Sequence, residues 1–111
     1  MDSQTITSAT INNITSGLVI HNEIKGKIQI KAVTTFKKAE SVLRYLLRFV
    51  AEKYKNKQII LFVHKDFIAG KKAYESLKCL KDNKCKYSDY NEGSEPYEDG
   101  LYICMRVPNN I

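Results

Sequence analysis

The feature that most constrains the fold is a run of five apolar residues, Ile59 to Val63, between two segments of helical period. The run is too short for a helix and β-branched enough for a strand covered on both faces. Before it, residues 36–54 predict an amphipathic helix of about five turns. After it, residues 67–82 repeat the helical pattern, with Asp66 as the expected N-cap. The sequence therefore predicts a central strand joined to two helices.

Alternating apolar and polar residues predict the remaining strands. Residues 27–33 alternate strictly, and Lys25-Gly26 is either a tight turn from a strand at 18–23 or a plain loop. Residues 84–90 and 101–107 predict a terminal antiparallel hairpin across a loop of about ten residues. Together these elements predict an α/β two-layer sandwich, with a mixed four- or five-stranded sheet and two helices on one side. The expected order is β-α-β-α-β-β, with a possible extra N-terminal strand.

Length and composition favour one domain inside a cell. Residues 1–16 are rich in Ser, Thr and Asn and are predicted to be a polar tail, while residues 17–111 form a single α/β domain. No apolar run reaches the roughly 20 residues that cross a bilayer, and no secretion signal is present. We therefore expect no membrane association and an intracellular location, in the cytoplasm or the nucleus. Three cysteines, an odd number, argue for reduced thiols.

The basic residues are concentrated in the middle of the chain. Seventeen of the 18 lie between Lys25 and Lys86, against five acids, which gives a local charge of +12. Such a field attracts polyanions, although lysines on helix faces also serve solubility. The candidate phosphate contacts cluster at the two helix starts, where free backbone N–H groups add to the positive charge: Lys37, Lys38, Lys65, Lys71, Lys72 and Arg44. The 15 lysines against three arginines predict contact with phosphates and little sequence preference.

Two aromatic residues and one glycine lie beside these lysines. Phe36 and Phe67 either stack on bases of nucleic acid or fix the helix starts by packing. Gly70 lies near the start of the second helix, where glycine weakens the helix by about 1 kcal/mol relative to alanine. It is either tolerated there or required because another group approaches the backbone closely.

The element order and three segments resemble the Alba family of DNA- and RNA-binding proteins. The segment Lys31 to Lys38 is similar to the strand-to-helix junction of that family, and His64 to Ala73 to its basic loop and helix start. The loop 91–100 corresponds to the arm that reaches into a groove of the duplex. The resemblance implies a nucleic-acid-binding protein that is not an enzyme and that takes DNA or RNA as its partner. We also expect a homodimer.

The chain departs from the Alba pattern in its arm, which is acidic. Residues 89–99 contain five acids and no base, together with tyrosines. This stretch supports an alternative function, a protein-interaction module such as an inhibitor or an assembly subunit. Its partner-binding residues would be Glu92, Glu95, Tyr97, Glu98 and Asp99.

Metal binding and catalysis have no recognisable motif in the sequence. The possible zinc ligands are Cys79, Cys85, Cys104 and His64, and their spacing fits no compact zinc signature. Core packing explains the three sulfurs more simply. The sequence therefore predicts no catalytic residue, no metal and no cofactor.

Overall fold

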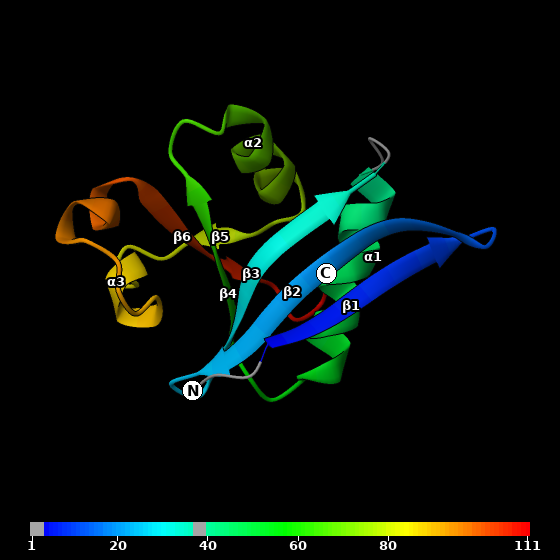
Figure 1. Cartoon of the computed structure of the whole chain (residues 1–111), viewed down its shortest axis with the longest axis horizontal. Coiled ribbons are helices and arrows are strands. Elements are labelled where there is room, and N and C mark those ends of the chain that lie inside the picture. The colour runs from blue at the N-terminus through cyan, green and yellow to red at the C-terminus, as the bar shows by residue number, and fades with distance from the viewer. Residues whose placement is uncertain (1–3, 37–39) are drawn as a thin grey trace.

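The computed structural model describes residues 4–36 and 40–111, apart from the side chains of Ile11 and Glu40. In this part of the chain six strands form one mixed sheet in the order β1-β2-β3-β4-β6-β5 (Figure 1). The strands are β1 (Gln4–Ile11), β2 (Ile14–Ile24), β3 (Lys27–Thr35), β4 (Ile59–His64), β5 (Leu80–Lys81) and β6 (Tyr102–Val107). The helices are α1 (Glu40–Lys53), α2 (Ile68–Ser76), α3 (Tyr87–Tyr90) and the 3-10 helix η1 (Pro96–Gly100). The α/β class is confirmed, with more strands and helices than expected.

Two tight hairpins build the first half of the sheet. Asn12 and Asn13 join β1 to β2, and Lys25 and Gly26 join β2 to β3, all four with positive φ. Two-residue turns with both φ values positive match the twist of the flanking strands, which is why Asn and Gly favour them. The tight turn at Lys25-Gly26 is thus confirmed over the plain loop. Strand β1 lies within the segment that was expected to be a polar tail.

The apolar run Ile59 to Val63 is the centre of the fold, as predicted. It forms most of β4, which pairs in parallel with β3 and antiparallel with β6. The first three residues of β4 are buried. Because parallel neighbours need a crossover connection, α1 carries the chain from β3 back to the start of β4.

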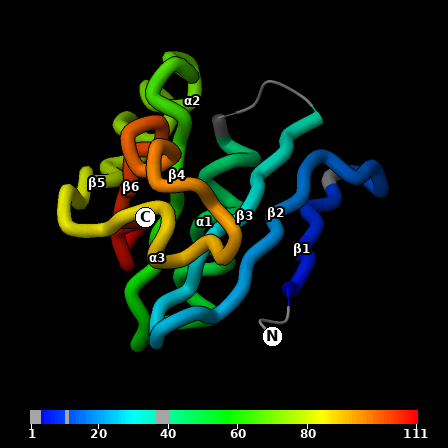
Figure 2. Tube along the Cα trace, turned by 60° about the vertical axis from the view of Figure 1, so that its left-hand side comes forward, coloured from blue at the N-terminus to red at the C-terminus, as the bar shows by residue number. Residues whose placement is uncertain are grey.

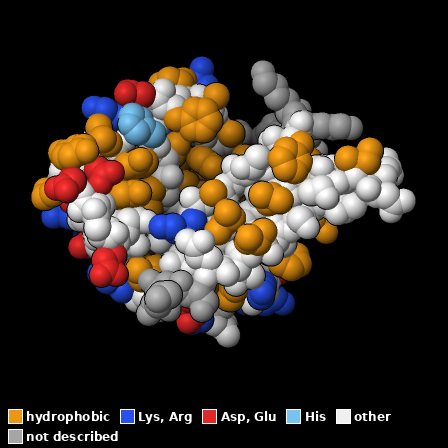
Figure 3. Space-filling view, viewed as in Figure 1, with side chains coloured by type: hydrophobic (Ala, Val, Ile, Leu, Met, Phe, Trp, Pro, Cys, Tyr) orange, Lys and Arg blue, Asp and Glu red, His pale blue; other side chains and the backbone are white. Residues whose placement is uncertain are grey.

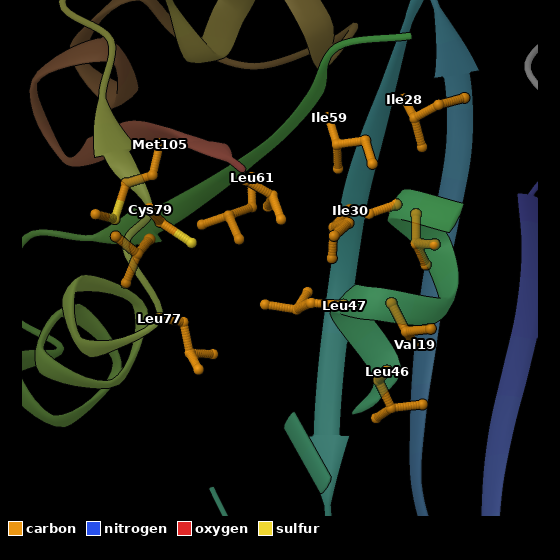
Figure 4. Close-up of a cluster of buried hydrophobic side chains, with 14 of the residues drawn as sticks. Val19, Ile28, Ile30, Leu46, Leu47, Ile59, Leu61, Leu77, Cys79 and Met105 are labelled. Carbon is orange, nitrogen blue, oxygen red and sulfur yellow. The ribbon is translucent and has the colours of Figure 1, made fainter. Parts of the chain in front are cut away.

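Helices α1 and α2 cover one face of the sheet, as expected. Side chains of α1 and Leu77, just after α2, meet β-strand residues in one buried cluster (Figure 4). Helix α1 lies very close to β2, because a Cβ at Gly17 would be 2.9 Å from the Thr34 carbonyl oxygen and 3.0 Å from Val42 Cγ1. Glycine at residue 17 therefore lets the helix pack against the sheet.

The segment from α3 to η1 covers part of the opposite face (Figure 2). Tyr87 packs edge-on against Phe62 of β4, with ring centroids 5.3 Å apart. Tyr87 also stacks on Tyr102 of β6 at 4.1 Å. These aromatic contacts hold α3 over the end of the sheet that contains β4 and β6.

The predicted second helix and terminal hairpin are wrong in detail. Helix α2 ends at Ser76 because the chain turns at Lys78, which has a φ of 68°. Leu80, expected in the buried stripe, is 61% exposed and belongs to β5, which pairs with β6. Residues 87–90, expected to pair with 101–107, form α3 instead.

The expected cap of α2 is also wrong. Phe67 occupies the N-cap position and makes no side-chain capping hydrogen bond. Asp66 instead donates its backbone N–H to Nδ1 of His64 at 3.1 Å. The loop after β4 is therefore tied to the strand and not to the helix.

No helix in residues 4–36 or 40–111 is long and apolar enough to cross a bilayer. Cys79 and Cys104 are buried and Cys85 is half-buried, which agrees with a packing role for these sulfurs.

Candidate active site

The candidate site is the place where β3 and β4 part. These parallel strands pair over three residues each, from Ile28 opposite Ile59 to Ile30 opposite Leu61. Both then continue, β3 to Thr35 and β4 to His64, and they diverge as Figure 1 shows. In open α/β sheets, ligands bind in the crevice at the carboxyl ends of parallel strands. A ligand site is therefore expected at the end of the sheet where β3 and β4 diverge.

A β-bulge lies at the point of divergence. Between β2 and β3, Ile20 is opposite Ala32 and His21 is opposite Ile30, so Lys31 is an extra residue on β3. Bulges bend a strand and increase its twist, and they are frequent next to active sites. Beyond the bulge, β3 residues 31–35 pair with no described strand on the side that faces β4. The backbone groups of this length that point away from β2 are therefore available to a ligand.

A cavity of about 580 Å³, hereafter the crevice, lies along this unpaired length of β3, on the side of the two helices. Its walls are mostly apolar and come from β3, α1 and α2: Val33, Thr35, Leu43, Phe67, Ala69, Gly70, Lys72, Ala73, Tyr74 and Ser76. A mostly apolar wall with a few polar groups is typical of small-molecule sites.

Tyr74 is the titratable group of this cavity that burial affects most. Burial raises the pKa of Tyr74, and the nearby Cys79 raises it further. The phenol therefore keeps its proton at neutral pH and can donate it to a basic atom in the cavity. Cys79 lies behind it, and burial raises the pKa of that thiol to about 11, so the sulfur stays a neutral thiol.

Phe67 closes the cavity beside the first turn of α2. Its ring covers Gly70, where an added Cβ would be 2.5 Å from Phe67 Cδ2. The group that approaches the Gly70 backbone closely is thus an aromatic ring of the chain itself. Phe67 is 57% exposed, which leaves one side of the ring open to solvent.

A second cavity, of about 700 Å³, lies on the opposite face of the sheet. It is bounded by β2 and β3 on one side and by residues 87–94 and Glu98 on the other. Lys31, the bulge residue, is in its wall. The two cavities therefore border the same unpaired length of β3, one from each face of the sheet.

The described residues among those predicted to contact phosphates do not form one cluster. Lys37 and Lys38 lie outside the described residues. Lys72 and Phe67 line the crevice, whereas Arg44 lies on the outer surface of α1 beside Tyr45 and Arg48. Phe36 is exposed at the end of β3, and Lys65 and Lys71 lie before and within α2. On the face in Figure 3, Lys and Arg side chains are dispersed among other side chains.

The acidic residues of the alternative prediction belong largely to the folded turn η1. Glu95 and Glu98 cap each other's backbone N–H groups. Asp99 accepts hydrogen bonds from the backbone N–H and the hydroxyl of Ser88, both at 2.8 Å, and these bonds lower its pKa. Tyr97 is exposed and Glu92 faces the second cavity. Part of this acidity is therefore structural.

Comparison with solved structures identifies the fold. No family model matches the sequence, and no curated protein matches it significantly. The ribosomal-protein-S18-alanine N-acetyltransferase of Escherichia coli superposes with a TM-score of 0.66 over 95% of this chain and 68% of its own, at 17% identity. An N-acetyltransferase from Staphylococcus aureus Mu50 gives 0.69 over 97% and 69%, at 14% identity. The chain has the fold of these acetyltransferases.

A shorter structure shares this fold as well. The anti-CRISPR protein AcrVA5 superposes with a TM-score of 0.53 over 89% of this chain and 96% of its own, at 14% identity. The chain thus spans about two thirds of the two acetyltransferases and nearly all of AcrVA5. At these identities the similarity concerns the fold alone.

The comparison corrects the functional expectations drawn from the sequence. The resemblance to the Alba family is wrong, because the structures that share this fold include several acetyltransferases. The expectation of a non-enzymatic DNA- or RNA-binding protein is wrong with it, since the solved structures that share this fold include N-acetyltransferases. The homodimer stays a prediction. The alternative of an interaction module acting through the acidic loop gains no support.

Tyr74 is not among the residues predicted from the sequence, because that prediction rested on the density of basic residues. The signal that could have found it is the strand-helix-strand order around α1, which predicts two parallel strands. Their carboxyl ends, near Thr35 and His64, are where a ligand is expected. Tyr74 then follows as a polar residue on the inner face of the next helix.

Proposed function

We propose that this chain transfers an acetyl group from acetyl-coenzyme A to an amine. The observation that carries the proposal is the crevice along the unpaired length of β3, beyond the point where the parallel strands β3 and β4 part, in a fold shared with acetyltransferases. Acetyl-coenzyme A supplies an activated thioester at the end of a long arm that contains amide groups.

The crevice suits such an arm. Its apolar walls match the arm's methylene groups, and the unpaired backbone of residues 31–35 offers N–H and C=O groups to the amides, in the manner of an added strand. Lys72 lines the crevice and Lys71 precedes it on α2, so positive charge is present for phosphates at the far end of the arm. Residues 31–35, Phe67 and Tyr74 would therefore hold the acetyl donor.

The residues of the site fit the proton and charge movements of the reaction. As the amine nitrogen bonds to the carbonyl carbon, the carbon–sulfur bond breaks, the nitrogen loses a proton to solvent, and the departing thiolate needs one. Tyr74 keeps its proton at neutral pH and can supply it, to be reprotonated from solvent. Free backbone N–H groups beyond the bulge can stabilise negative charge on the carbonyl oxygen.

Calorimetric titration with acetyl-coenzyme A tests the proposal. We expect saturable binding that is lost in Ala73→Phe, because the added ring fills the crevice. The matched control is Glu75→Phe, which places the same ring on the exposed side of the same helix and should bind normally. Circular dichroism checks that both variants are folded. The absence of binding to the unmodified chain, or equal binding by both variants, would refute the proposal.

A further inference from the structure

The two edges of the sheet differ in length and in charge. One edge is β5, which has two residues, one of them Lys81. The other edge is β1, which has eight residues and pairs with β2 alone among the described strands. Natural proteins protect edge strands from pairing with other chains by shortness, by lysine or proline, or by irregular pairing. The edge at β5 has two of these protections, because it is short and carries a lysine.

Strand β1 lacks most of these protections. Its sequence, QTITSATI, contains no charged residue and no proline. Residues 4–9 pair with residues 17–22 of β2 in unbroken register, and the irregularity of this pairing lies beyond Ala9. Most of the outer edge of β1 is therefore a regular row of backbone N–H and C=O groups to which another strand can add.

The hairpin of β1 and β2 is uncharged over a long stretch. Residues 4–22 contain no Lys, Arg, Asp or Glu, although the chain has 18 basic and 12 acidic residues. In Figure 3 the end of the molecule that this hairpin forms, at the right, is white and orange. A net charge of +6 makes two copies of the chain repel each other. The hairpin is therefore a surface on which a second copy meets little repulsion.

An exposed apolar row begins at the β1 edge. Val19 of β2 is buried in the core, so the next residue, Ile20, points to the face of the sheet that α1 and α2 do not cover. Ile20 is opposite Ile6 of β1 on one side and Ala32 of β3 on the other. Ile6 is 66% exposed. An apolar side chain at an edge can pack on a side chain of the same face in an added strand.

We propose that β1 pairs antiparallel with β1 of a second copy of this chain, so that the two sheets join into one. In a two-fold pair the same strand meets itself in the reverse direction. An uncharged strand suits this arrangement, because no like charges come to lie opposite each other. A two-fold axis perpendicular to the sheet also places both apolar rows on the same face, where they meet at the joint. An extended peptide of another protein would use the backbone groups of the edge but would leave the apolar row without this continuation.

Sedimentation of the full chain at increasing concentration tests the inference. We expect the average mass to rise from that of one chain towards twice that mass. Ile6→Lys should weaken the association by about tenfold or more, because residue 6 is near the middle of the regular edge and two ammonium groups would meet beside the two-fold axis. The matched control is Leu80→Lys, which changes a similarly exposed apolar residue on the other edge of the sheet and should associate normally. Circular dichroism checks that both variants are folded.

Hydrogen exchange then locates the contact. We expect backbone amides of residues 4–9 to exchange more slowly as the concentration rises, and those of β5 to be unaffected. A single copy at all concentrations, equal weakening by both lysine variants, or slowed exchange only outside β1 would refute the inference. These results are independent of the titration with acetyl-coenzyme A, because the crevice is lined by β3, α1 and α2. Failure of one proposal therefore leaves the other intact.

Discussion

The ring of Phe67 lies against Gly70 so closely that any side chain at residue 70 would displace it: an added Cβ would be 2.5 Å from Phe67 Cδ2 and 2.6 Å from Phe67 Cε2. Both residues line the crevice between β3, α1 and α2. The contact therefore sets the shape of the crevice beside the first turn of α2.

Because of this contact, the effect of Gly70→Ala on the free energy of unfolding should depend on the residue at position 67. Gly70→Ala should destabilise the protein, because the ring must move, although alanine is the better helix former. In a Phe67→Ala background the clash is absent, and the same substitution should stabilise the fold by about 1 kcal/mol. Urea unfolding of the four proteins of this cycle measures both effects. The same sign in both backgrounds would contradict the prediction.

In the proposed reaction, Tyr74→Phe should reduce the rate of acetyl transfer by about 100-fold or more, because the departing thiolate would lose its proton donor. Binding of acetyl-coenzyme A should change little, since the phenyl ring still fills its place in the wall of the crevice. Steady-state kinetics and calorimetric titration separate the two effects. An unchanged kcat would exclude Tyr74 as the donor.

The raised pKa of Tyr74 also predicts how kcat depends on pH. Only the protonated phenol can donate, and its pKa lies above the ordinary value. The Tyr74-dependent part of kcat should therefore persist through neutral pH and fall only on the alkaline side, above the normal tyrosine pKa of about 10. Tyr74→Phe should lack this alkaline fall in a kcat against pH profile.

His21 should make the fold less stable as the pH falls. Burial lowers its pKa below 6.5, and the positive charge of Lys53 lowers it further. The unfolded chain therefore binds more protons than the folded chain between the folded pKa and about 6.5, so this contribution to stability is complete above pH 6.5 and declines below it. Urea unfolding between pH 7.5 and 5.5 should show the decline, and His21→Leu should reduce it. An identical pH slope in the variant would contradict the prediction.

Asn91→Ala should destabilise the protein by about 1 to 3 kcal/mol, because it leaves Gln29 and the Tyr87 carbonyl without their buried donor. Hydrogen exchange should accelerate in residues 87–91 more than in the core strands. Asn83→Ala, at an exposed position in the same connecting segment, should change stability by about 0.5 kcal/mol at most. Uniform acceleration over the whole sheet would mean that the network does not hold this segment specifically.

The central elements of the fold were predictable because local pattern and tertiary environment agree there. The apolar run at Ile59 to Val63 has buried neighbours on both faces, and Lys25-Gly26 supplies the positive φ values that its turn requires. The end of α2 was not predictable from residue type. Its turn uses Lys78 at a φ of 68°, a conformation that a lysine does not signal.

The segment between β5 and β6 was mispredicted because long-range contacts decide its structure. The alternation of residues 84–90 is typical of a strand, yet Tyr87 stacks on Tyr102 and Ser88 is held by Asp99. The functional interpretation failed for a related reason. The number of lysines in the sequence does not say where they lie in the folded chain. The crevice lies beyond the point where β3 and β4, two strands about 30 residues apart in the sequence, stop pairing.

Residues 87–99, which include the acidic stretch, are attached to the sheet through amide groups and tyrosine rings and have little share in the apolar core. Substitutions in this segment can therefore accumulate without disturbing the packing of α1 and α2. A substitution in this segment is therefore expected to act on its own amide and aromatic contacts, as at Asn91, and to leave the helix side of the sheet packed.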